Sequence, residues 1–246
     1  MKLVHVTAVG FILAASMSSA VNQSTYQQAL RSVTAGEVSI ESIKDTPIAG
    51  MKELTVNTGK TLEIIYISAD GNYIFNGSLF DVKNRVDITA SHKNGLRSQQ
   101  LLKFSDSDRI NFFPDNMTDK VTVFTDLDCP YCRQMHQQMA DYNELGIGIS
   151  YLFFPRTGLN TDSAQKAVYA WCAENPKKAL NKAMAGEQLP EIQCDNPVAD
   201  HYNAGIAVGV SGTPALILED GTMLPGLIPP QQLKQRLDRI NKSPQP

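Results

Sequence analysis

The stretch VTVFTDLDCPYC, residues 121–132, carries the most information about the fold of this chain. Its first five residues are β-branched or aromatic and predict a buried strand, and the pattern over residues 134–142 predicts a helix. Cys129 and Cys132 therefore fall where a strand turns into a helix. Two thiols three residues apart at that position favour a redox pair.

The N-terminus of a helix is a suitable place for a reactive cysteine. Unpaired backbone N–H groups and the positive end of the helix dipole stabilise a thiolate, which is the species that attacks a disulfide. Pro130 fits the first helical turn because its missing N–H costs nothing there. Cys132 lies about one turn further on and can attack a mixed disulfide formed on Cys129. We therefore expect Cys129 to be the nucleophile and Cys132 the resolving thiol.

Half of a zinc site is the alternative reading of any CxxC motif, and it requires a second cysteine pair. The other cysteines, Cys172 and Cys194, are too far apart to form a second zinc knuckle. Their separation of 22 positions instead favours a structural disulfide, worth about 3 kcal/mol in the chain-entropy model, over a second redox pair. We expect neither a metal nor a cofactor.

The first twenty residues resemble a secretory signal peptide. Lys2 gives a positive start, residues 3–15 are largely apolar, and Ser18-Ser19-Ala20 supplies small residues for cleavage. No later apolar run approaches the roughly 20 residues that a membrane span needs. The sequence thus predicts an exported, soluble protein in an oxidising compartment, which permits a stable Cys172–Cys194 disulfide. A net charge of −3 argues against a nucleic-acid partner.

Residues 21–82 are expected to form a small α+β domain. A short helix is predicted over 26–33 and strands over 52–56, 61–68 and 72–76, with Asp70-Gly71 as a hairpin turn. A domain of about 60 residues buries so little apolar surface that it is only marginally stable by itself. We expect this domain to dimerise with a second copy, the alternative being packing against the rest of the chain. Residues 83–118 are more polar and predict a linker with a short helix over 96–104.

Residues 119–246 are expected to form a second domain. The strand over 121–126, its helix and a second strand over 147–154 predict a parallel pair with a right-handed crossover. Helices over 161–172, 176–184 and 198–206 follow, then a hairpin over 215–224 and a closing helix over 229–241. This β-α-β core, helical insertion and β-β-α ending is the element order of the thioredoxin fold. The whole chain is thus predicted to be α+β, with a thioredoxin-like α/β domain at its C-terminal end.

Several short motifs, taken together, resemble the DsbC/DsbG family of periplasmic disulfide isomerases. They are FTD before the CxxC (124–126), QQMADYN after it (137–143), FPR (154–156), WCA (171–173), CD (194–195), HY (201–202), GVSGTP (209–214), PIAGM (47–51) and FDV (80–82). The resemblance implies a V-shaped homodimer joined through the N-terminal domains, with an uncharged cleft for misfolded substrate. It also implies a membrane electron donor of the DsbD type that keeps the CxxC cysteines reduced.

The resemblance also assigns supporting residues around the two cysteines. Pro214 matches the family's cis-proline, with Thr213 before it, lying against the CxxC motif, the alternative being a trans proline that opens a strand. The dipeptide between the cysteines is Pro130-Tyr131, where the family usually has Gly-Tyr, and Pro-Tyr is a pair also seen in glutaredoxins. Asp128 stands where the family commonly has threonine. A carboxylate beside a thiolate raises the pKa of the thiol whereas a helix dipole lowers it, so the outcome depends on where Asp128 points.

These observations predict a periplasmic thiol–disulfide isomerase with chaperone-like binding of its substrates. The second enzymatic interpretation is a reductase or oxidase of narrower substrate range that resembles DsbG. A third, non-enzymatic interpretation is a holdase whose apolar cleft binds unfolded chains. His136, one turn from Cys132, is expected to be a surface or packing residue, because a helix terminus can activate Cys129 without a base.

Overall fold

The computed structural model describes residues 13–242, and the chain divides into two compact units between Thr89 and Ala90. Residues 1–12 of the expected signal peptide lie outside the described part. Helix α1 (Leu13–Val33) begins before the helix expected at Tyr26 and continues through the predicted cleavage point. Among the described residues, no helix combines the length and the apolar character that a membrane span requires.

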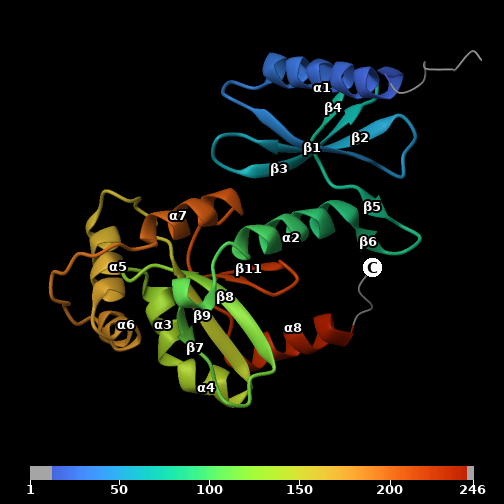
Figure 1. Ribbon diagram of the computed structural model, residues 1–246. Coiled ribbons are helices and arrows are strands. Elements are labelled where there is room, and N and C mark those ends of the chain that lie inside the picture. The colour runs from blue at the N-terminus through green and yellow to red at the C-terminus, as the bar shows by residue number, and fades with distance from the viewer. Residues whose placement is uncertain (1–12, 243–246) are drawn as a thin grey trace, which may run out of the picture. The chain divides into compact units, whose positions relative to one another are not determined.

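The N-terminal unit is a four-stranded antiparallel sheet with α1 packed on one face (Figure 1). Its strands, in sheet order, are β1 (Ser39–Asp45), β2 (Met51–Asn57), β3 (Leu62–Ser68) and β4 (Ile74–Phe75). The core forms where Tyr26 and Leu30 of α1 meet apolar side chains of the central strands, among them Leu54, Val56, Ile65 and Ile67. A small hairpin of β5 (Phe80–Asp81) and β6 (Val86–Asp87) follows. The hairpin expected at Asp70-Gly71 joins β3 to β4, and the glycine has the positive φ of 77° that such a turn favours.

Strand β1 was not predicted from the sequence. Its residues SIESIKD are mostly polar, and their side chains are largely exposed at the edge of the sheet. The strand is held by backbone pairing with β2, with a register shift between Ile40 and Ser42. Because pairing with a neighbour, and not a buried apolar face, stabilises this strand, its alternation is too weak to identify it.

The segment expected to be a linker contains more regular structure than predicted. Helix α2 (Ile88–Leu101) begins eight residues before the helix expected at Leu96, and Ile110–Phe112 forms strand β7 after a short 3-10 turn, η1 (Asp106–Asp108). Asn94-Gly95 is a turn signal by itself, but α2 is stabilised by tertiary hydrogen bonds. Arg97 Nε donates to the carbonyl of Val208 at 3.2 Å, and Ser98 Oγ donates to that of Glu219 at 2.9 Å.

The C-terminal unit is built on a five-stranded sheet of order β11-β10-β8-β9-β7. Strands β8 (Asp119–Thr125) and β9 (Ile147–Phe153) are parallel and central, and β10 (Ala215–Ile217), β11 (Met223–Pro225) and β7 join antiparallel. The helices are α3 (Pro130–Gln137), α4 (Met139–Glu144), α5 (Asp162–Cys172), α6 (Pro176–Met184), α7 (Val198–Ala207) and α8 (Pro230–Lys242). This order confirms the predicted thioredoxin-like fold with a helical insertion.

Helices cover both faces of the central strands, so every residue of β9 is buried (Figure 1). On one side Gly205 lets α7 pack closely against the ring of Phe154, which follows β9. A Cβ at position 205 would lie 2.4 Å from a ring carbon of Phe154. On the other side the helix predicted over 134–142 is divided at Gln138 into α3 and α4. A short turn connects the carboxyl end of β8, at Thr125, to the N-terminus of α3, at Pro130.

Candidate active site

The two cysteines of the CxxC motif lie at the start of α3. Cys129 is the N-cap residue, with extended φ and ψ of −85° and 119°, and Pro130 occupies the first turn. Both thiols are free, and both residues are buried, whereas Tyr131 between them is 60% exposed. The pair therefore lies just under the surface, next to an exposed aromatic side chain.

The cis peptide bond between Thr213 and Pro214 lies against this pair. In its thiol form Cys129 donates from Sγ to the carbonyl oxygen of Thr213 at 3.2 Å. The hydroxyl oxygens of Thr125 and Thr213 are buried and make no hydrogen bond among the described residues. Leaving a buried hydroxyl unpaired costs about 1–3 kcal/mol. A thiolate, which accepts hydrogen bonds where a thiol donates weakly, offers such hydroxyls a partner.

The two thiols have opposite pKa shifts. Burial raises the pKa of Cys129, but interactions with Thr213, the backbone N–H of Cys132 and the charge of Arg156 outweigh it, so the pKa lies below the ordinary value. Burial dominates at Cys132 and raises the pKa of that thiol to about 12, and the negative charge of Cys129 adds to the shift. The arrangement favours a thiolate on Cys129 and a protonated thiol on Cys132.

Asp126, between β8 and the cysteines, organises the surrounding loops. Its buried carboxylate accepts four hydrogen bonds: from the N–H of Asp128 at 2.8 Å, Ser163 Oγ at 2.6 Å, and the N–H and Nε of Arg156 at 3.0 and 2.9 Å. Burial raises the pKa of Asp126, but these donors lower it below the usual range. Asp126 therefore remains charged and holds Arg156 near Cys129.

Asp126 and Arg156 belong to the FTD and FPR motifs, which carry the resemblance, but the sequence alone assigns neither residue a role. Their positions offered a signal, because Asp126 directly follows β8 and Arg156 lies just beyond β9. The carboxyl ends of neighbouring parallel strands share one edge of a sheet, which is where sites form in α/β folds.

Asp128 points toward cations. Lys166 Nζ lies 2.7 Å from Oδ1 and 3.0 Å from Oδ2 of its carboxylate, and a guanidinium nitrogen of Arg133 lies 3.5 Å from Oδ1. The sequence left the direction of this side chain open, because the partner lysine is 38 positions away.

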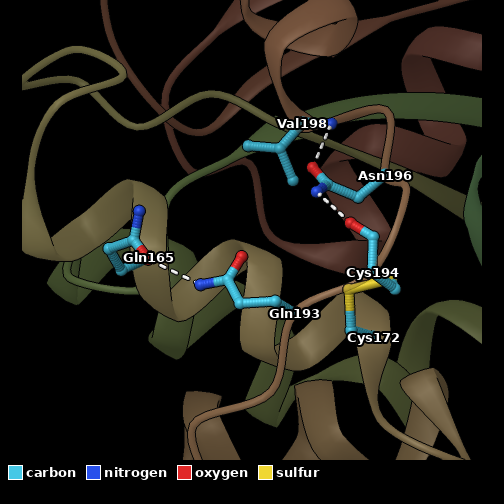
Figure 2. Close-up of a disulfide and its surroundings, with 6 residues drawn as sticks. All are labelled: Gln165, Cys172, Gln193, Cys194, Asn196 and Val198. Atoms are coloured by element: carbon cyan, nitrogen blue, oxygen red, sulfur yellow. Dashed lines mark hydrogen bonds between the residues drawn. A yellow bond between two sulfur atoms is a disulfide. The ribbon is translucent and has the colours of Figure 1, made fainter.

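Cys172 and Cys194 form a disulfide with an S–S length of 2.00 Å and a Cα–Cα distance of 5.6 Å. It joins the end of α5 to the loop that leads into α7 (Figure 2). Neighbouring hydrogen bonds hold the same loop: Gln193 Nε2 donates to Gln165 Oε1 at 3.1 Å, and Asn196 Nδ2 donates to the carbonyl of Cys194 at 2.9 Å. The two CxxC cysteines and this pair are thus separate sites in one unit.

The two histidines of this unit that carry shifted pKa values are packing residues. Nδ1 of His136 lies 3.2 Å from the hydroxyl of Tyr151, Nε2 lies 3.0 Å from Asn181 Oδ1, and burial lowers the pKa of the ring. His201 accepts the backbone N–H of Phe153 at 3.2 Å, and burial lowers its pKa to about 4. Both rings therefore stay neutral and structural at pH 7. Within the described residues, no group of three or more His, Cys, Asp or Glu side chains could hold a metal ion.

Two known protein families match parts of this chain. A thioredoxin-like domain matches residues 108–241, and a disulfide bond isomerase protein N-terminal domain matches residues 17–90. The thiol:disulfide interchange protein DsbC of Escherichia coli (strain K12) is 40% identical over 200 residues, which cover 81% of this chain and 82% of that protein. DsbC of Salmonella typhimurium is 36% identical over 232 residues, 94% of this chain and 95% of that protein. A disulfide interchange protein from Neisseria gonorrhoeae, known as a crystal structure, is 30% identical, with a TM-score of 0.49 over 57% of this chain and 100% of that chain.

Proposed function

The chain belongs to the DsbC family of thiol:disulfide interchange proteins, and we propose that it rearranges incorrect disulfides of exported proteins through Cys129 and Cys132. The observation that carries this proposal is the asymmetry of the two thiols. One buried cysteine at a helix N-terminus has a lowered pKa, and its neighbour has a pKa raised to about 12. In such a pair one cysteine is the attacking thiolate, and the other is a protonated thiol that can later resolve the mixed disulfide.

In the proposed reaction the Cys129 thiolate attacks one sulfur of a substrate disulfide. A bond forms between Cys129 and that sulfur, the substrate's S–S bond breaks, and the released thiolate takes up a proton. The freed substrate thiol, after losing its proton, can attack elsewhere in the substrate and finally displace Cys129, so that no net oxidation occurs. Alternatively Cys132 loses its proton and attacks the Cys129 sulfur, which leaves the protein oxidised and the substrate reduced by two electrons.

The raised pKa of Cys132 favours the first of these two outcomes. A thiol that stays protonated attacks slowly, so the mixed disulfide survives long enough for substrate thiols to exchange. We assign support of this step to Pro130, Tyr131, Thr213 and Pro214. Tyr131 is exposed beside the pair and can contact a substrate chain, and the Thr213 carbonyl already hydrogen-bonds Cys129.

The N-terminal unit is the proposed dimerisation domain. Its sheet has two edge strands, β1 and β4, and its surface carries large exposed apolar side chains, including Tyr73, Phe75, Phe80 and Val82. Association with a second copy would bury the exposed apolar side chains and would pair or cover the strand edges. We further propose export to the periplasm by residues 1–20 and reduction of Cys129 and Cys132 by a membrane donor of the DsbD type.

Reactivation of scrambled ribonuclease tests the proposed function. Wild type should reactivate it, and a Cys129→Ser variant should not. If Cys129→Ser reactivates ribonuclease as well as wild type, or if both only suppress aggregation, the protein acts as a holdase and the proposed chemistry is wrong.

Deletion of residues 21–82 tests the role of the N-terminal unit, because it retains every residue of the C-terminal unit. The shortened protein should sediment as a monomer and still reduce insulin, since Cys129, Cys132 and Pro214 all remain. It should lose most isomerisation, because two sites in one dimer hold a misfolded chain by avidity. A monomer that isomerises at the rate of the intact protein would contradict the proposed dimeric clamp.

A further inference from the structure

The carboxylate of Asp128, adjacent in sequence to the proposed nucleophile, is bound by two cations from different helices. Lys166 comes from α5 and contacts both carboxylate oxygens, and Arg133 comes from α3 and contacts one. All three side chains are partly exposed, at 34% for Asp128, 37% for Arg133 and 48% for Lys166. Ion pairs this exposed contribute little to the stability of the fold. Their position next to Cys129 suggests instead an effect on the thiol.

The backbone that presents Asp128 is fixed without these ion pairs. The N–H of Asp128 donates to Asp126 Oδ1 at 2.8 Å, and the N–H of Cys129 donates to the Asp126 carbonyl at 3.0 Å. Arg133 Nε also donates to the carbonyl of Leu127 at 2.8 Å. With the turn fixed, the side-chain rotamer of Asp128 decides how near its carboxylate comes to Cys129.

Two other ionisable groups near Cys129 do not oppose its thiolate. Asp126 is paired with Arg156, whose positive charge favours the thiolate, and Cys132 stays protonated at neutral pH. The two carboxylates differ in their own burial: Asp126 is 2% exposed and accepts hydrogen bonds from backbone N–H groups, whereas Asp128 is 34% exposed and is compensated by the side chains of Lys166 and Arg133. An uncompensated carboxylate beside a thiolate disfavours the thiolate.

We propose that Lys166, together with Arg133, is a positioning residue that holds the Asp128 carboxylate in an ion pair and so keeps its negative charge from opposing the Cys129 thiolate. The inference rests on the proposed role of Cys129 as the nucleophile. It accounts for how this chain carries an aspartate directly before its redox pair and still stabilises a thiolate there.

A redox consequence follows for exchange with glutathione. Two glutathione thiols reduce the Cys129–Cys132 disulfide: that S–S bond breaks, one forms in glutathione disulfide, and the reduced protein carries the thiolate on Cys129. Whatever destabilises the thiolate destabilises the reduced protein. Loss of Lys166 should therefore shift this equilibrium toward oxidised protein by about 1.4- to fivefold, the range expected for a partly exposed pair.

A double-mutant cycle on the full-length protein tests the inference with Lys166→Met, Asp128→Asn and the double variant. Two quantities are measured: the pH dependence of Cys129 alkylation by iodoacetamide, located by mass spectrometry, and the equilibrium constant with glutathione. Lys166→Met should raise the pKa of Cys129, and Asp128→Asn should lower it. Because Lys166 acts through Asp128, its replacement should have a clearly smaller effect in the Asp128→Asn background.

Two control variants test whether the effect needs a cation at position 166 and whether it follows from any change in net charge. Lys166→Arg keeps the cation and should retain the wild-type pKa and equilibrium. Lys178→Met removes one positive charge from an exposed position on α6 and should change neither. Lys166 is half-exposed, so its replacement should leave the fold intact, which circular dichroism checks.

Equal effects of Lys166→Met in both backgrounds would overturn the inference, because Lys166 would then act as an independent charge. An unchanged or lowered pKa of Cys129 in Lys166→Met would overturn it as well. These results are distinct from failure of the proposed function. A wild type that titrates Cys129 as described but cannot reactivate scrambled ribonuclease refutes the isomerase role alone, and normal reactivation with an additive cycle refutes the positioning role alone.

Discussion

The two cysteine pairs of the C-terminal unit carry the same functional group in contrasting settings. Cys129 and Cys132 are three positions apart at a helix start, free and buried beside a cis-proline, with a charged network behind them. Cys172 and Cys194 are 22 positions apart and joined in a disulfide that fixes a loop to the end of a helix. Burial by itself raises the pKa of a thiol, so the lowered pKa of Cys129 depends on Thr213, the N–H of Cys132 at the helix start and the charge of Arg156.

The largest expected effect is loss of exchange when the first pair is broken. Cys129→Ser should reduce isomerisation to the rate of uncatalysed glutathione exchange, since no other described thiol has a lowered pKa. Cys132→Ser should instead accumulate mixed disulfides with substrate, visible on non-reducing gels, because the nucleophile remains and the resolving thiol is gone. Mixed disulfides trapped by Cys129→Ser and not by Cys132→Ser would reverse the assigned roles.

A second test uses pH to sharpen the contrast within the first pair. The pKa of Cys129 is lowered, so its thiolate persists as the pH falls, whereas Cys132 has a pKa of about 12 and is protonated over that range. At neutral and mildly acidic pH the thiolate fraction should therefore be far larger on Cys129 than on Cys132. Iodoacetamide at mildly acidic pH should therefore label Cys129 first in the reduced protein. Preferential labelling of Cys132 would contradict the described electrostatics.

The second pair should matter for stability and not for chemistry. Replacing both Cys172 and Cys194 by alanine removes a cross-link that closes a loop of 22 residues, worth about 3 kcal/mol of unfolding free energy in the chain-entropy model. For a protein of this size that corresponds to roughly 6–12 °C in Tm. Calorimetry measures the shift, and ribonuclease reactivation per folded molecule should stay nearly unchanged. A folded double variant without turnover would place this disulfide in the electron path.

The sequence predicted best where one segment determines its own structure. The strand expected over 121–126 and helix α6 (Pro176–Met184) form as predicted, the strand from its β-branched and aromatic residues and the helix from a proline at its first turn. The helix expected over 134–142 is divided at Gln138. Strand β1 escaped prediction because partner strands, not its own apolar pattern, stabilise it. Strand β7 is only three residues long and lies among turn-forming residues.

The same distinction applies to the site. The CxxC cysteines and the proline between them form a local motif, and they were found from sequence. The carboxylate of Asp126 gathers donors from Arg156 and Ser163, which are 30 and 37 positions away. Asp128 likewise finds Lys166 across 38 positions. A single sequence does not show these long-range contacts, so only the structure identifies these residues as part of the site.

The smallest expected effect concerns the residue that separates the reactive pair from an ordinary helix start. Pro130 has a fixed φ that suits the first turn of α3, and glycine there would let that turn fray. Fraying weakens the contact between the Cys132 N–H and the Cys129 sulfur, which is one of the interactions that lower the pKa of Cys129. In Pro130→Gly we therefore expect that pKa to rise and the reduction potential to shift by at least about 10 mV, equivalent to roughly 0.5 kcal/mol for a two-electron couple. Equilibration with glutathione measures the shift, with the Cys172–Cys194 disulfide as an internal control that should stay oxidised throughout. Identical potentials for the two proteins would mean that the helix start is rigid without proline, and that the hydrogen bonds of Asp126 suffice to hold the turn.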